Sequence, residues 1–253
     1  MRRFAFFLAG LLAAVPLAVN AMEPETRVGA YLYATGITGE TGVGDVTADV
    51  DVGFDDILAN LDLGFMGFVD HRRGRWSFLG DFAYLRLADE DSSTVGRAVE
   101  IDVEAELEQT VLSGYAGYRV YASDPGDSDI GIDLMLGVRH TTLAIDLDLD
   151  NAVGNRNRSR DGDEDWLDAV IAARIEADYR NGWGSLLWLD LGEGSDSSSY
   201  QLMALASYQG GDHWKFFGGY RFLNLEYDSG SGDSTFDVDL DYSGPMFGAA
   251  YQW

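Results

Sequence analysis

The stretch Ile130-Gly-Ile-Asp-Leu-Met-Leu-Gly-Val-Arg-His-Thr-Thr-Leu143 decides the fold class. A period of two residues predicts a β-strand, because successive side chains of a strand point to opposite faces. Asp133 and Arg139 lie on one face. The other face is aliphatic: Ile130, Ile132, Leu134, Leu136 and Val138. Such a strand is typical of a transmembrane β-barrel, in which lipid covers the outside and polar groups line the inside.

The same alternation recurs along the chain in segments near the length of about 9–11 residues that a tilted membrane strand requires. Ten can be marked: 27–35, 61–70, 76–87, 110–121, 130–143, 166–179, 184–191, 200–209, 214–225 and 244–253. The weakest is 184–191, whereas 43–52 offers extra strand pairing. Ten strands are therefore expected, with eight or twelve left open.

The connections between these segments alternate between short and long. The short ones are 71–75, 122–128, 181–183 and 210–212, and the long ones are 36–60, 88–101, 145–164, 192–199 and 224–241. Outer-membrane barrels have short periplasmic turns and longer external loops. We therefore predict an all-β, antiparallel up-and-down transmembrane barrel with both termini periplasmic. A lipocalin-like soluble barrel, with its apolar faces inside, is the alternative.

The N-terminus has the pattern of a cleaved signal peptide. Arg2 and Arg3 precede the apolar stretch 4–19, and Val19-Asn20-Ala21 offers small residues to a signal peptidase. We therefore predict a signal peptide at 1–21, a barrel domain at 22–253, and export to the outer membrane. An uncleaved anchor is the alternative, although the stretch is shorter than the roughly 20 residues that a spanning helix needs.

The composition excludes some partners. The chain has no cysteine and a formal charge of −26. Without Arg2 and Arg3, 15 basic residues remain against 43 acidic ones, which gives −28. Such a chain should repel nucleic acid, which binds basic patches, and attract cations.

The last eight residues, Met246-Phe-Gly-Ala-Ala-Tyr-Gln-Trp253, resemble the terminal β-signal of bacterial outer-membrane proteins. Gly248, Tyr251 and Trp253 fit that pattern, and Met246 departs from it because a polar residue is usual there. The resemblance implies recognition by the barrel assembly machinery. The mature chain as a whole resembles small Gram-negative outer-membrane barrels of the opacity-protein, OmpA and OmpW types and porin-like proteins. Outer-membrane lipid and lipopolysaccharide are then the expected surroundings.

Charged residues on the inward faces form the main candidate site. They are Asp81, Asp133, Arg139, Arg174, Glu176, Lys215 and Arg221. Charges of both signs in a narrow lumen should pair, because isolated buried charges are costly. Two interpretations follow: a salt-bridge network that fills the interior, which is favoured because small barrels have little internal room, or a network that frames a narrow hydrated pore.

The external connections concentrate carboxylates in four runs: 89–91, 146–150, 161–165 and 237–241. Asp146, Asp148 and Asp150 are weak candidates for a site of the Ca²⁺ type, since alternating carboxylates share one side of a strand. No segment has the spacing of an EF-hand loop. A solvated acidic rim is the favoured interpretation, with divalent cations as further candidate partners. No cofactor is expected.

Catalytic residues are not expected; two kinds of outer-membrane hydrolase are the alternatives. A lipid A deacylase needs a His-x-Ser pair, and His140 is followed instead by Thr142. An omptin-like protease needs an Asp–His pair at the outer rim, where His140 would be the histidine available. His71 and His213 flank expected periplasmic turns.

The leading hypothesis is a non-enzymatic outer-membrane barrel that acts as a narrow, cation-preferring, porin-like passage or as a structural surface protein. The alternative is an adhesin-like or ligand-binding barrel that acts through its acidic loops. An outer-membrane hydrolase is the third.

Overall fold

The structure is a computed structural model that describes residues 24–43, 46–53, 61–94, 100–123, 128–151, 158–230 and 236–253. The expected signal peptide lies outside these residues. Every regular element within them is a strand. The described residues contain no helix that is long and apolar enough to cross a bilayer.

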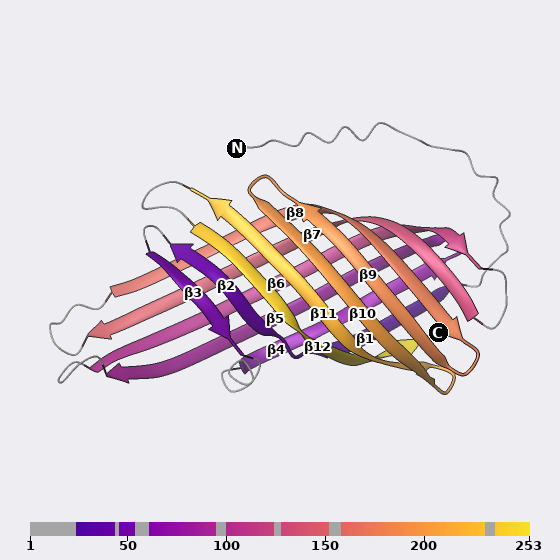
Figure 1. Cartoon of the computed structure of the whole chain (residues 1–253), viewed down its shortest axis with the longest axis horizontal. Coiled ribbons are helices and arrows are strands. Elements are labelled where there is room, and N and C mark those ends of the chain that lie inside the picture. Colours follow the sequence, from indigo (N-terminus) through magenta and orange to yellow (C-terminus); the bar gives the residue numbers. More distant parts are fainter. Residues whose placement is uncertain are drawn as a thin grey trace.

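Ten strands form a closed antiparallel barrel (Figure 1). They are β1 (Glu25–Tyr33), β4 (Leu61–Arg73), β5 (Trp76–Thr94), β6 (Glu100–Ala122), β7 (Ser128–Asn151), β8 (Arg158–Tyr179), β9 (Trp183–Glu193), β10 (Ser197–Gly210), β11 (Trp214–Ser229) and β12 (Phe236–Gln252). Each strand pairs with its neighbour in this order, and β1 pairs with β12 to close the ring. The predicted ten-stranded up-and-down barrel is confirmed.

A hairpin of two further strands, β2 (Gly36–Val43) and β3 (Val46–Val52), extends the wall. The pairing of β1 with β12 ends at Tyr33 opposite Met246, and β2 continues along β12 from Gly36 opposite Ser243. The pairing expected within 43–52 is therefore present. It belongs to an extension of the wall, so the sheet has twelve strands and the closed ring has ten.

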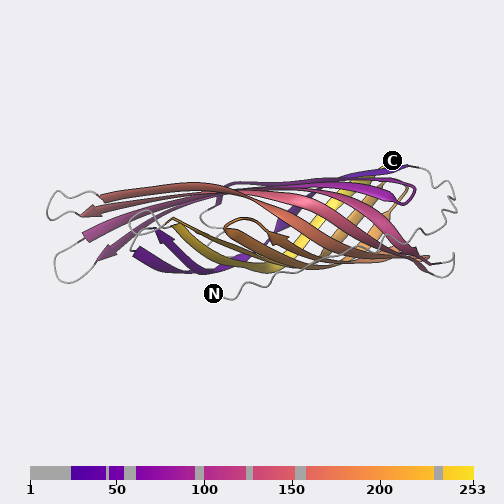
Figure 2. The ribbon, with the colours of Figure 1, turned by 90° about the horizontal axis from the view of Figure 1, so that it is seen from above.

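Four neighbouring strands are much longer than the alternation predicted. β5, β6, β7 and β8 contain 19, 23, 24 and 22 residues, and they project beyond the rest of the barrel (Figures 1 and 2). The acidic runs expected in loops lie on strands instead. The expectation was wrong because an acidic strand outside the bilayer can still form its backbone hydrogen bonds while water solvates its carboxylates.

The opposite end of the barrel, called here the turn end, is compact. Gly74, Gly182 and Gly211 occupy its turns with φ of 61°, 82° and 79°, a backbone region that favours glycine. The first turn is shorter than the predicted 71–75, because β4 continues to Arg73. Arg72 therefore belongs to a strand, and its side chain reaches an ion-pair partner in the barrel interior.

The outward face carries an apolar band and, at the turn end, pairs of aromatic rings. Val28, Leu134, Ile171, Leu189 and Phe216 are among its exposed apolar residues. The aromatic pairs are Trp76–Tyr118, Trp183–Tyr208, Trp214–Tyr251 and Tyr251–Trp253, with centroids 5.1–5.9 Å apart. Such a girdle marks the interface of a membrane barrel. The alternative of a soluble barrel with its apolar faces inside therefore does not apply.

The interior is not polar throughout. In its half nearer the long connections, called here the loop end, a buried apolar cluster fills the space between strands. Its members are Ile37, Val111, Leu143, Trp166, Leu223, Leu225, Phe236, Val238, Leu240 and Tyr242. This cluster is called here the apolar core. It departs from the sequence prediction, in which 224–241 is a connection. Once β12 begins at Phe236, its alternating apolar residues face inward.

Candidate site in the barrel interior

A layer of hydrogen-bonded side chains lies in the lumen directly below the apolar core. It consists of Tyr31, Asp81, Tyr115, Arg139, Asp190, Gln201 and Arg221 and is called here the mid-barrel layer. Arg139 and Asp190 form its central ion pair, at 2.8 Å, and their side chains are 1% and 0% exposed. Arg139 also donates to Tyr115 Oη at 3.1 Å and to Ser199 Oγ at 2.9 Å.

The layer continues around the barrel through a chain of neutral and charged partners. Gln201 donates to Asp190 at 2.9 Å and accepts from Arg221 at 2.8 Å. Arg221 donates to Tyr31 Oη at 3.2 Å, and Tyr31 donates to Asp81 at 3.0–3.1 Å. These contacts join β7, β9, β10, β11, β1 and β5, passing over β8, β12 and β4. The layer therefore follows the ring of strands at one depth. The contacts that reach furthest across the lumen are Arg139–Ser199, from β7 to β10, and Tyr115–Asp190, from β6 to β9.

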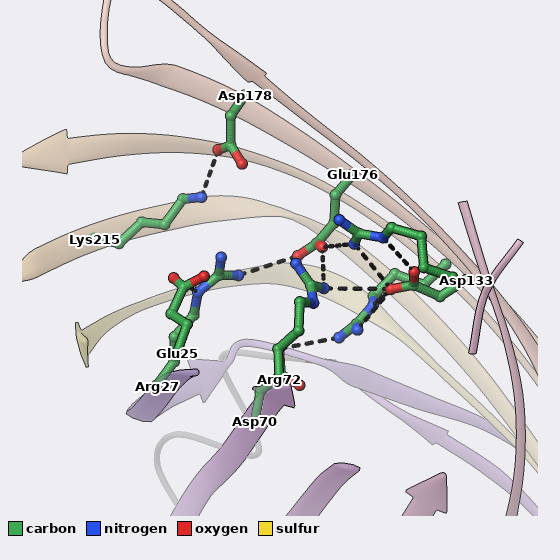
Figure 3. A network of polar contacts seen from close by, with 10 residues as sticks. Glu25, Arg27, Asp70, Arg72, Asp133, Glu176, Asp178 and Lys215 are labelled. Carbon is green, nitrogen blue, oxygen red and sulfur yellow. Dashed lines mark hydrogen bonds and ion pairs between the residues drawn. The ribbon is translucent and has the colours of Figure 1, made fainter. Parts of the chain in front are cut away.

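A second group of ion pairs lies nearer the turn end and is called here the turn-end network (Figure 3). It contains Arg27, Asp70, Arg72, Arg119, Asp133, Arg174 and Glu176. Asp133 accepts from Arg119 at 2.6 Å and from Arg174 at 2.8 Å. Arg174 also reaches Asp70 at 3.1 Å.

Glu176 is the second anion at the centre of the turn-end network. It accepts from Arg72, from Arg119 at 3.1 Å and from Arg27 at 3.1 Å. Its side chain is 11% exposed, so several cations compensate one nearly buried carboxylate. Shared partners of this kind satisfy buried charges that would otherwise be costly.

The structure divides the seven predicted lumen residues into three groups. Asp81, Arg139 and Arg221 belong to the mid-barrel layer. Asp133, Arg174 and Glu176 belong to the turn-end network. Lys215 stands apart and pairs with Asp178 at 2.7 Å, where the Asp178 side chain is 52% exposed.

The period of two also places Arg119 and Asp178 on inward faces, although neither is in the predicted set. Four further charged partners were not predicted: Arg27, Asp70, Arg72 and Asp190. Asp190 could have been found, because the outward residues Leu189 and Leu191 place it on the inward face of β9. Arg72 lies in the predicted turn 71–75. Arg27 and Asp70 lay within predicted strands, but single charges near a strand end carry no signal for a buried partner.

The three residues of the predicted assembly signal lie at the closing seam of the barrel. Tyr251 and Trp253 face outward and join the turn-end aromatic pairs. Gly248 faces inward, where a Cβ would overlap Ala30 O on β1 and lie 2.6 Å from Phe217 Cζ. Glycine therefore has a packing role at this position, whatever recognises the segment during assembly.

The candidate cation ligands Asp146, Asp148 and Asp150 lie on β7. In the strand register their partners on β6 are Glu106, Glu104 and Asp102, in that order, and on β8 Asp161 is opposite Asp146 and Ser159 is opposite Asp148. The side chains of these three residues lie outside the part that the structure describes, so the cation site stays a prediction. Among the described side chains, no group of three or more acidic or histidine residues is placed to hold a metal ion.

His140 lies on the outward face, where its Nε2 is 3.1 Å from Asp165 Oδ2. Both side chains are solvent-accessible, at 42% and 71% exposure. Thr142 shares this face and is the cross-strand neighbour of Asp165. His71 and His213 lie near the turn end, bonded to Thr26 Oγ1 and to the Gln252 carbonyl.

At the loop end, Tyr227 covers the apolar core. Its ring stacks on Trp166 with centroids 4.7 Å apart, and its hydroxyl donates to Glu164 at 3.0 Å. A hydrogen bond with Ser229 lowers the pKa of Tyr227, but burial and the Glu164 carboxylate outweigh it and raise that pKa. The phenol therefore stays protonated as a donor.

Comparisons with known proteins agree with this architecture. No protein-family model matches the sequence, and no curated protein matches it. The outer membrane protease OmpT of Escherichia coli is similar in structure, with a TM-score of 0.52, 11% identity, and coverage of 94% of this chain and 99% of that one. Ail of Yersinia pestis gives 0.39 and 12% over 92% and 100% of the two chains, and the translocator domain of NalP from Neisseria meningitidis gives 0.46 and 11% over 90% and 86%. The protein has the fold of the small outer-membrane β-barrels, a class that includes adhesins, porins and proteases.

Proposed function

We propose that this protein is a non-conducting outer-membrane barrel that presents an acidic β-sheet at the cell surface. This sheet, called here the extension, is the part of β5, β6, β7 and β8 that projects beyond the rest of the barrel. The observation that carries the proposal is the closed interior. Arg139, Asp190 and the members of the apolar core are buried at successive depths. A hydrated pathway would leave lumen-lining charges accessible to water, so the porin-like passage is the less favoured of the two leading interpretations.

Planar-bilayer conductance of the refolded mature chain under a salt gradient tests this proposal. We expect no reproducible current steps from protein whose folding is verified by its heat-dependent mobility on a gel. Cation-selective steps that change selectivity when Arg139 is replaced, Arg139→Gln, would overturn the proposal and restore the narrow passage.

The extension supports a role outside the bilayer. The 24 residues of β7 span roughly 80 Å at about 3.3 Å per residue, more than twice the length that a tilted membrane strand needs. In the proposed orientation the extension carries the acidic runs 89–91, 146–150 and 161–165 to the outer surface, where lipopolysaccharide phosphates attract divalent cations. We propose that the extension concentrates such cations and associates through them with lipopolysaccharide or other anionic surfaces, with export and barrel assembly guided by residues 1–21 and by Gly248, Tyr251 and Trp253.

A hydrolase is the second candidate, and the His140–Asp165 pair is the observation that favours it. A carboxylate that orients a histidine is one half of a nucleophilic constellation, and Thr142 offers a hydroxyl on the same face. The test is release of acyl chains from lipopolysaccharide by the refolded protein. If turnover occurs, His140→Ala should abolish it and His213→Ala should not. Equal turnover in all three proteins would remove this candidate.

A further inference from the structure

A chamber of about 140 Å³ lies in the turn-end half of the barrel. The mid-barrel layer forms its roof, through Tyr31, Asp81, Gln201 and Arg221, and the turn-end network forms one wall. The Lys215–Asp178 pair lies at its other end, where Asp178 is half-exposed. The chamber therefore opens at the turn end and is closed toward the loop end.

The rest of the chamber is apolar. Its lining includes Phe68, Leu79, Leu186, Met203, Leu205 and Phe217. Aromatic and thioether side chains of this kind offer favourable surfaces to a flat apolar molecule. The chamber thus combines an apolar majority with a few polar groups, which is the usual composition of a small-molecule site.

Two glycines keep the centre of this chamber open. A Cβ on Gly29 would lie 2.5 Å from Phe68 Cε1, and one on Gly248 would lie 2.6 Å from Phe217 Cζ. Any larger residue would push these rings away from the wall and into the space between them. The centroids of the Phe68 ring on β4 and the Phe217 ring on β11 are 5.9 Å apart, with β1 and β12 between these strands. The glycines on β1 and β12 allow both rings to lie against the wall.

Asp70 supplies the polar feature that selects a ligand. It lines the chamber and is 6% exposed, and its Oδ2 accepts from Arg174. Its Oδ1 has no hydrogen-bond partner among the described residues. A buried carboxylate oxygen left unpaired costs free energy, so a donor on a bound molecule would stabilise it.

We propose that the chamber binds a small, mainly apolar ring compound that carries one hydrogen-bond donor, of the phenol class, entering from the periplasmic side. The volume limits the size, because an apolar cavity of about 150 Å³ accommodates a single benzene ring. Asp70 Oδ1 accepts from the hydroxyl, and Phe68, Phe217 and Met203 surround the ring. This inference is independent of the proposed surface role, since a silent barrel and a conducting one could both hold the ligand.

Fluorine NMR titration of the refolded full-length mature chain in detergent tests the proposal with 4-fluorophenol and 4-fluorotoluene. These probes have nearly the same shape, and the phenol alone carries a donor. We expect saturable binding of 4-fluorophenol. Leu205→Trp should weaken both probes at least tenfold by filling the chamber, and Leu202→Trp, on the lipid-facing side of the same strand, should leave both unchanged.

Asp70→Asn tests the donor. The amide keeps an oxygen for Arg174 and replaces the free acceptor by an NH₂ group. We expect about a tenfold weaker affinity for 4-fluorophenol, the loss of one hydrogen bond to a charged group, and less than a twofold change for 4-fluorotoluene.

Two results would overturn the proposal. Equal signals from wild type and Leu205→Trp would mean that the probes only enter the micelle. Equal losses of both probes in Asp70→Asn would remove the assigned acceptor. If Leu205→Trp does not fold, Ser207→Phe takes its place, with the lipid-facing Ala206→Phe as its control.

Discussion

Asp70 depends on Arg174 for its ion pair, whereas Asp133 has three arginine partners. Arg174→Met should therefore leave Asp70 as an uncompensated buried charge and lower the free energy of unfolding by about 3–5 kcal/mol. Urea titration of the protein refolded into vesicles measures the effect. Arg174→Met combined with Asp70→Asn should recover much of the loss.

Lys215→Met is the matched control for that substitution. It removes a cation from a pair whose acid is half-exposed, and exposed pairs contribute about 0–1 kcal/mol. A Lys215 variant as unstable as the Arg174 variant would contradict the distinction between the buried network and the rim.

Substitutions at Gly248 and Trp253 separate a role in packing of the folded barrel from a role in its assembly in cells. Gly248→Ala should lower the stability of refolded protein by about 1–3 kcal/mol, because the new methyl group meets β1 and Phe217. Trp253→Ser should refold normally in vitro but should reduce the yield of membrane-inserted protein in cells. The Trp253 ring is exposed, and Tyr251 is the aromatic ring that it contacts in the described part of the chain. Normal insertion of Trp253→Ser in cells would contradict the assembly role.

For single residues, the sequence predicts which face of a strand a side chain occupies better than it predicts the partner that the side chain contacts. The period of two places Asp133 and Arg174 on inward faces, and the register sets them directly opposite each other. The contact between Arg221 and Tyr31 joins strands that are not neighbours, so it depends on the curvature and stagger of the whole barrel. No local pattern carries that information.

Among the elements, the β2–β3 hairpin is an addition to a ring that closes without it. Replacing residues 36–52 by a short Gly-Ser linker removes Ile37 from the apolar core and leaves one edge of β12 unpaired along 236–243, while the other edge still pairs with β11. The barrel should still form, with a lower midpoint of thermal unfolding. A deletion variant that fails to refold would show that the hairpin belongs to the folding unit.

The boundaries of the elements were harder to predict than their existence. Transmembrane segments were recognised because lipid demands an apolar face. Beyond the bilayer that demand ends, and Asp-Leu-Asp-Leu-Asp at 146–150 and Asp-Val-Asp-Leu-Asp at 237–241 alternate as strands while their composition is typical of loops. For these two runs the period predicts the observed strands and the charge does not.

For the whole molecule, a role that depends on the negative charge of the extension can be separated from a role that depends on its length alone. Two hairpin tips offer a matched comparison. Replacing 89–105 by Asn-Gly removes six acidic residues and Arg97, whereas replacing 146–161 removes four acidic residues and three arginines. The two deletions are nearly equal in length, and both retain the register of the barrel below them.

If the extension acts through its negative potential, the first deletion should weaken Ca²⁺ binding at low ionic strength and the second should change it little, because the net charge removed is −5 in one case and −1 in the other. Equilibrium dialysis of the folded variants measures both. Equal weakening would point to the length or shape of the extension, and no weakening in either variant would remove the cation-concentrating role and leave the turn-end chamber as the place to seek a ligand.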